Sequence, residues 1–127
     1  MRKKVLIIAA LAEGGFGLLL FSAPPLVARL LFATEASGVA IIVGRLTGIC
    51  LIALAIACWP TGDSRNALYG MLAWSVLAMV YLIVIGLNGP VGTLLWPAVV
   101  AHGAIALLLL WTRRQQILLN PRKNGSA

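Results

Sequence analysis

The sequence is poor in charged residues, and acidic residues are the rarest of them. Only 10% of the 127 residues are Asp, Glu, Lys or Arg, and only three are acidic, whereas about a quarter of a soluble domain is charged. The chain has one histidine, His102, and two cysteines, so it has no cluster of the side chains that bind zinc or other transition metals. A single histidine also argues against haem. We therefore expect no metal and no cofactor.

Catalytic patterns are missing as well. Cys50 and Cys58 lie in one apolar run, about 12 Å apart along a helix axis, which is too far for a disulfide between them. No serine or threonine has a partner base of the right kind, and no glycine-rich phosphate loop occurs between a strand and a helix. The sequence therefore predicts a protein that is not an enzyme.

What the sequence does have is apolar residues in long runs. Hydrophobic residues make up 61% of it, and the mean hydropathy is +1.02. A soluble fold of this size cannot hide that much apolar surface, but a bilayer can, and backbone in lipid must be helical or form a closed barrel. The runs do not alternate as barrel strands would. Four membrane-spanning helices are predicted, at residues 5–21, 39–59, 67–87 and 93–111.

The connections between the runs are short. Residues 24–32 begin with Pro24 and Pro25 and place apolar residues on one face and Arg29 on the other, which predicts a short helix lying in the membrane interface. Short loops make neighbouring spans antiparallel and favour an all-α, up-down four-helix bundle. The spans form one membrane domain over residues 1–112, and residues 113–127 form a basic cytoplasmic tail.

The basic residues predict the orientation. The net charge of +7 would suggest nucleic acid in a soluble protein, but here the basic residues flank the apolar runs, so we expect no nucleic-acid partner and a lipid bilayer instead. With both termini in the cytoplasm of a bacterium's inner membrane, the outer side carries only Arg29. The cytoplasmic side then carries Arg2, Lys3, Lys4, Arg65, Arg113, Arg114, Arg122 and Lys123.

Three ionisable residues fall inside the predicted spans: Glu13, Arg45 and His102. Such residues are costly in a bilayer and often mark function. Counted from the cytoplasmic edge, Glu13 is about 12 Å deep, His102 about 17 Å, Arg45 about 20 Å and Tyr81 about 21 Å. The four residues form a candidate buried polar site, in which Glu13 is expected to pair with Arg45. The layer is either a structural network that fixes the helices or a functional site for protons, a carboxylate substrate or a quinone head group.

Small residues predict where helices pack. Gly44 and Gly48 form a small-x-x-x-small step, which permits close approach of two helices in a membrane. Glu13 shares a helix face with Ala9, Ala10 and Gly17, so its side chain is expected to point into the protein and away from lipid.

Three stretches, residues 23–32, 44–54 and 95–102, resemble small four-helix bacterial membrane proteins, broadly similar to the DoxX-like group. They read APPLVARLLF, GRLTGICLIAL and LWPAVVAH. The likeness covers most of the chain and implies the four-span layout. Some DoxX-like proteins are associated with quinone-linked sulfur oxidation, so the resemblance implies a quinone-linked accessory role as an alternative function.

Ala12 and Glu13, in the first of four short spans, resemble the small multidrug resistance transporters. In that family a membrane-embedded glutamate exchanges protons for cationic drugs. This chain departs from the family in having Arg45, which could neutralise the glutamate, and in its additional Pro24-Pro25 segment. The third span also lacks a glycine-rich dimerisation face.

The leading expectation from the sequence is a non-enzymatic accessory or interaction subunit, bound to other membrane subunits or to copies of itself. It rests on size, because about 90 membrane-embedded residues leave little room for a substrate cavity in one copy. The alternatives are a proton-coupled small-molecule transporter that acts as an oligomer and a quinone-linked redox accessory.

Overall fold

The computed structural model describes residues 1–61 and 65–119, and every regular element in these residues is a helix. Four of the helices are long and apolar enough to cross a membrane, which confirms the all-helical fold and the four long apolar segments. The predicted short helix at residues 24–32 is also present. The helices are α1 (Arg2–Ser22), α2 (Pro24–Phe32), α3 (Val39–Ala57), α4 (Arg65–Asn88) and α5 (Leu95–Leu119).

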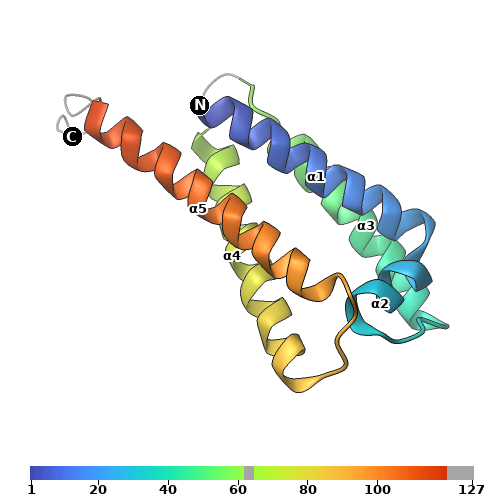
Figure 1. Cartoon of the computed structure of the whole chain (residues 1–127). Helices are drawn as coiled ribbons and strands as arrows, with labels where there is room; N and C mark the ends of the chain where they lie inside the picture. Colours follow the sequence, from blue (N-terminus) through green and yellow to red (C-terminus); the bar gives the residue numbers. More distant parts are fainter. Residues whose placement is uncertain (62–64, 120–127) are drawn as a thin grey trace.

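The first two long helices, α1 and α3, form an antiparallel pair (Figure 1). Gly14 lies beside Ala55, and Gly17 lies beside Gly48, so the two helices run in opposite directions. At the second contact the backbones nearly touch: a Cβ added to Gly48 would lie 2.6 Å from the Gly17 carbonyl oxygen and 2.7 Å from the Phe21 nitrogen. The predicted close approach at Gly48 is thus a contact between α3 and α1.

The other two long helices, α4 and α5, form a second antiparallel pair. Gly86, near the end of α4, faces Leu95 at the start of α5, and Gly103 in the middle of α5 faces Met79. The contacts thus advance along α5 as they go back along α4, so the two helices are antiparallel.

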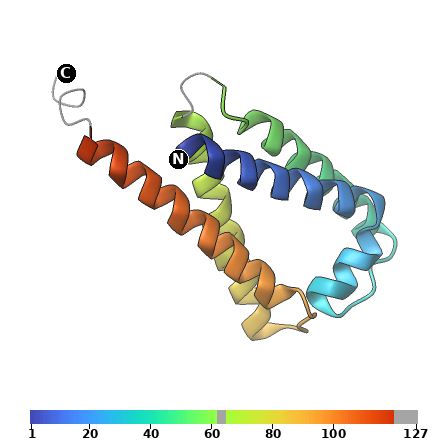
Figure 2. The same ribbon diagram turned by 45° about the horizontal axis from the view of Figure 1, so that its top comes forward.

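The two pairs meet at one end of the molecule. The N-terminal end of α1 and the C-terminal end of α5 both lie at this end (Figures 1 and 2), and a buried apolar cluster joins all four long helices there. Small residues of α1 and α3 let the larger side chains of α4 and α5 fill the space between the pairs. The cluster consists of Leu6, Ala9, Ala10, Ala55, Cys58, Leu68, Met71 and Leu109.

At the opposite end, α2 joins the two pairs. The carbonyl oxygens of Leu30 and Leu31, in the last turn of α2, accept hydrogen bonds from the backbone N–H groups of Leu94 and Gly92, at 2.9 Å and 2.8 Å. These carbonyls have no partner within their own helix, so the loop before α5 satisfies them. The pairs are thus held together at both ends, and between those ends they stand apart instead of packing evenly as a closed bundle.

The predicted tail starts inside a helix. Arg113 and Arg114 belong to α5, which continues to Leu119, and the guanidinium of Arg113 stacks over the Tyr69 ring at 5.3 Å from its centroid. Residues 120–127, with Arg122 and Lys123, lie outside the described residues, as do residues 62–64 of the predicted loop between the second and third spans.

Candidate functional site

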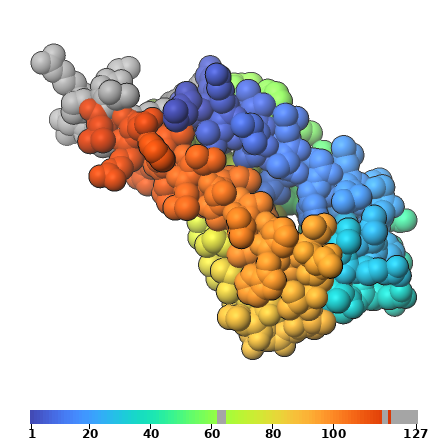
Figure 3. Space-filling model, in the orientation of Figure 1, coloured from blue at the N-terminus to red at the C-terminus, as the bar shows by residue number. Residues whose placement is uncertain are grey.

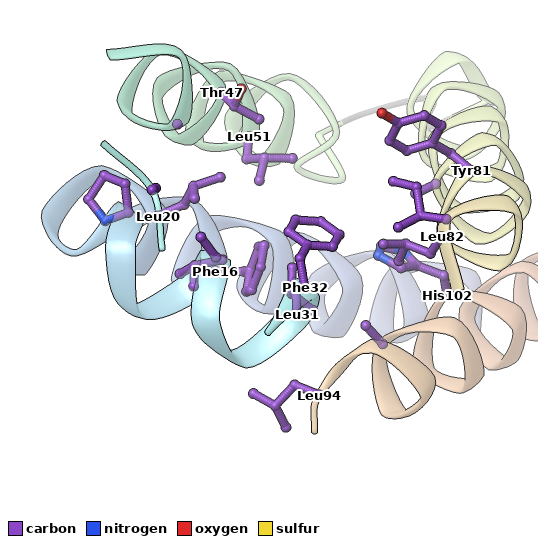
Figure 4. Close-up of a pocket in the computed structure, with 18 of the residues that line it drawn as sticks. Phe16, Leu20, Leu31, Phe32, Thr47, Leu51, Tyr81, Leu82, Leu94 and His102 are labelled. Atoms are coloured by element: carbon purple, nitrogen blue, oxygen red, sulfur yellow. The ribbon is translucent and has the colours of Figure 1, made fainter. Parts of the chain in front are cut away.

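An open cleft of about 1090 Å³ separates the two helix pairs. It appears as a hollow between α1 and α5 in Figure 3, and all five helices contribute to its walls. In Figure 4, Phe16 and Phe32 from α1 and α2 lie across the cleft from Leu82 and His102. This volume corrects the expectation that one copy of so short a chain leaves little room for a cavity.

Glu13 lies in the wall of the cleft that α1 provides, and its residue is only 4% exposed. It follows Ala9 by one helical turn and precedes Gly17 by another, so it belongs to the packed face of α1. Ala9, Ala10 and Gly17 are all buried, and their small size lets the neighbouring helices close around the carboxyl group. The predicted inward orientation of Glu13 is what the structure shows.

His102, on α5, lies beside Glu13. Its Nδ1 atom lies 3.6 Å from Oε1 of Glu13, and the side chains are 17% and 5% exposed, respectively. That distance is longer than a hydrogen bond, and Nδ1 has no hydrogen-bond partner within the described part of the chain. The structure therefore brings together two of the four predicted site residues, close enough for one bridging atom to join them.

Trp74, on α4, completes the floor of the cleft, and sequence reasoning misses it. Its ring packs edge-on against His102, with the centroids 6.4 Å apart and the planes at 78°. The indole also lies beside Glu13, but its buried Nε1–H has no hydrogen-bond partner among residues 1–61 and 65–119. Tryptophans at span ends indicate the membrane interface. Trp74 lies inside an apolar span instead, and that position is the sequence signal that could have identified it as a site residue.

Tyr81 lines the same cleft, two turns beyond Trp74 on α4. The residue is 66% exposed, and its side chain makes no hydrogen bond to the described residues. Figure 4 shows it on the far side of Leu82 from the α1 wall. Tyr81 is thus part of the cleft but not of the buried polar group formed by Glu13, His102 and Trp74.

Arg45 is the predicted site residue that the structure places elsewhere. Its side chain is exposed and does not line the cleft, and the described residues show no ion pair between it and Glu13. Two geometric reasons account for this. Gly14 packs beside Ala55, so Glu13 is level with residues near Ala55, about 15 Å along α3 from Arg45. In addition, Thr47 faces the cleft, which turns Arg45, two residues earlier, to the opposite side of the helix.

The mouth of the cleft carries a second carboxylate. Glu35 lines the cleft beyond the end of α2, and its carboxylate pairs with the Arg29 guanidinium at the surface. Both side chains are largely exposed, so this pair adds little to stability.

The arrangement is suited to binding a molecule that is mostly apolar. Apolar walls can hold an apolar body, while the carboxylate, imidazole and indole at the floor can bind a polar head or hold a proton. The described residues contain no group of three potential metal ligands. Comparisons with family models, with curated proteins and with solved structures give no match to this chain.

Proposed function

We propose that this chain is a non-enzymatic integral membrane protein with four spans, which acts as an accessory or interaction subunit by holding an apolar partner molecule in its cleft. The cleft itself carries the proposal: it measures about 1090 Å³ and is lined mostly by apolar side chains. Binding sites for small molecules are concave and mostly apolar, with a few polar groups that orient the ligand. Glu13, His102 and Trp74 are those groups here.

The outward faces of the four long helices support the membrane location. They expose large apolar side chains along their length, such as Ile8 on α1, Ile42 on α3, Leu77 on α4 and Leu107 on α5. Each square ångström of such surface costs roughly 25 cal/mol in water, and a bilayer removes that cost. Four spans also return the chain to the side on which it started.

The distribution of charge supports an orientation with both ends in the cytoplasm. Arg2, Lys3 and Lys4 begin α1, and Arg113 and Arg114 lie in α5 near its C-terminal end, at the same end of the molecule. Basic residues next to spans concentrate on the cytoplasmic side. In this orientation α2 lies at the outer face of a bacterium's inner membrane, where its first-turn prolines and exposed Arg29 suit the interface.

A proton-coupled transporter is the second candidate, and the position of Glu13 favours it. A transport carboxylate must line a path that substrate can reach, and Glu13 lines the cleft. Arg45, which would have neutralised it, faces away. Reconstituted liposomes with a pH gradient test this candidate: transport requires a proton flux that lipophilic cations stimulate and that the Glu13→Gln variant abolishes.

Native mass spectrometry of the purified full chain tests the binding proposal. The wild-type protein should retain one small apolar molecule through gentle detergent extraction. Ala101 lines the cleft, whereas Ala104, three residues later on the same helix, does not. Ala101→Phe should therefore displace the molecule, and Ala104→Phe, the matched control, should keep it. Equal occupancy in the two variants, or a wild-type protein with nothing bound, would contradict the proposal.

A further inference from the structure

The floor of the cleft presents polar groups that lack hydrogen bonds. Trp74 Nε1–H and His102 Nδ1 are buried and have no partner within the described chain, and the Glu13 carboxylate lies 3.6 Å from His102 Nδ1, just outside hydrogen-bond range. Leaving a buried polar group without a partner costs about 1–3 kcal/mol. All three residues line the cleft, so an occupant of the cleft can supply what they lack.

The types of the three groups define the head of that occupant. The indole N–H only donates a hydrogen bond, and an ionised carboxylate only accepts one. A neutral imidazole nitrogen that carries no hydrogen also accepts. A head group that accepts one hydrogen bond and donates one through the same small atom suits this floor, because His102 lies against both Glu13 and the Trp74 ring.

We propose that the cleft binds a membrane-dissolved alcohol or phenol with a long apolar body, and that its hydroxyl group bridges the floor. The hydroxyl oxygen accepts the Trp74 Nε1–H and donates its own hydrogen to the Glu13 carboxylate or to His102 Nδ1. The apolar body lies between the walls that include Phe16, Phe32 and Leu82. This inference rests on the proposed binding function and adds the chemical class of the ligand.

Other head groups fit the floor less well. An ammonium group has three donors and no acceptor capacity, so it leaves the Trp74 N–H without a partner. A carboxylate meets like charge at an ionised Glu13 and has no hydrogen to donate to Glu13 or His102. An isolated carbonyl accepts from Trp74 but donates nothing to Glu13 or His102. Of these head groups, a hydroxyl group is the one that serves both sides of the floor with a single atom.

The position of the cleft determines how such a molecule enters. It lies between two pairs of membrane-spanning length, and its walls on α3 and α4 reach exposed apolar residues such as Val43 and Leu77. A molecule dissolved in the bilayer can therefore enter sideways with its apolar body in contact with protein or lipid throughout. The hydroxyl group is the only part that leaves water, and the floor replaces its hydrogen bonds.

Three matched probes test the inference on the full chain in lipid nanodiscs. Equilibrium binding is measured for 4-nonylphenol, for its methyl ether 4-nonylanisole, and for nonylbenzene, with empty nanodiscs as the blank. The ether can accept a hydrogen bond but cannot donate one, and the hydrocarbon can do neither. We expect the phenol to bind about tenfold more tightly than the ether and about a hundredfold more tightly than nonylbenzene, at about 1.4 kcal/mol for each of its two hydrogen bonds.

Two variants assign the effect to the floor. Trp74→Phe removes the donor and should reduce the preference for the phenol over nonylbenzene about tenfold, which leaves the contribution of the bond donated to Glu13 or His102. Trp111→Phe is the matched control, because Trp111 is exposed and does not line the cleft; it should keep the full preference. Circular dichroism verifies that both variants are folded, and the probe comparison on the wild-type protein stands even if Trp74→Phe does not fold.

The outcomes separate this inference from the function on which it rests. If the phenol, the ether and the hydrocarbon all bind equally, the hydroxyl inference is wrong while the apolar cleft still binds. If nonylamine in its ammonium form binds as tightly as the phenol, the head group is a cation and the inference is again wrong. If no probe binds above the empty nanodisc, both the inference and the proposed function fail.

Discussion

Replacing Gly48 with alanine should separate the α1–α3 pair. The new Cβ would lie 2.6 Å from the Gly17 carbonyl oxygen and 2.7 Å from the Phe21 nitrogen, and ordinary contact begins near 3.4 Å. The obstructing atoms are backbone atoms, so no side-chain rotation relieves the clash. The helices must instead move apart by roughly 0.8 Å, which loses packing along the interface.

The expected loss of stability follows from two opposed effects. Overpacking of a tight contact costs about 1–3 kcal/mol, while exchanging glycine for alanine inside a helix returns up to about 1 kcal/mol. We expect a net loss of about 1–2 kcal/mol, which is about a tenfold fall in the folding equilibrium constant.

Denaturation of the purified chain by SDS in mixed micelles, followed by circular dichroism, measures this change. Gly15→Ala is the matched control, because Gly15 lies on the same pair of helices and a Cβ added there would have nothing within 4 Å. That variant should gain stability, by about 0.5–1 kcal/mol. The reasoning would be refuted if Gly48→Ala were as stable as Gly15→Ala, because the two substitutions differ only in what the new methyl group meets.

Reporter fusions should place the turn after Asn88 in the periplasm and the end of α5 in the cytoplasm; the reverse result would overturn the assignment of sides. A double-mutant cycle between Glu13→Gln and Arg45→Gln should give a coupling energy near zero, because the two residues are far apart. The cycle between Glu13→Gln and His102→Phe should instead give a coupling energy of about 0.5 kcal/mol or more. Gly92→Ala should destabilise the fold by about 2 kcal/mol or more in the same SDS assay, since its Cβ would overlap the backbone of α2; an unchanged transition would show that this contact is dispensable.

The helices could be predicted from the sequence because four long apolar runs without alternation favour one kind of structure. Backbone in lipid must form its hydrogen bonds internally, so each long apolar run becomes one helix, and Pro24 with Pro25 marks the start of the short one. The hydropathy of the sequence therefore predicts most of the helices. The inward face of α1 was also predictable, because Ala9, Ala10 and Gly17 recur at helical spacing around Glu13.

The partner of Glu13 could not be predicted with the same means. Depth counted along each span assumes that all spans begin at one level, but α1 is shifted along α3, because Gly17 and Gly48 set the register by close contact. That shift carries Arg45 away from Glu13, and it is a property of packing between two helices that neither run displays alone. Trp74 escapes sequence reasoning for a similar reason, since its role depends on which helix faces it.

The cleft could not be predicted because it lies where the α1–α3 pair and the α4–α5 pair do not pack against each other. Hydrophobic patterning says that α4 and α5 bury a face, but not whether that face meets α1 and α3 along its whole length. The separation depends on α2, whose position between the pairs is fixed by the hydrogen bonds from Gly92 and Leu94.

Those hydrogen bonds also bear on the order in which the chain can mature. The carbonyl groups of Leu30 and Leu31 are made early in synthesis, but the N–H groups that they need belong to the segment just before α5, which emerges after α4. Until then the end of α2 must remain in contact with water or lipid head groups, because its open carbonyls cannot enter hydrocarbon at acceptable cost. In the proposed membrane arrangement, the end of α2 is therefore expected to wait at the membrane surface until the segment before α5 emerges, and arrival of the final helix then joins the two pairs.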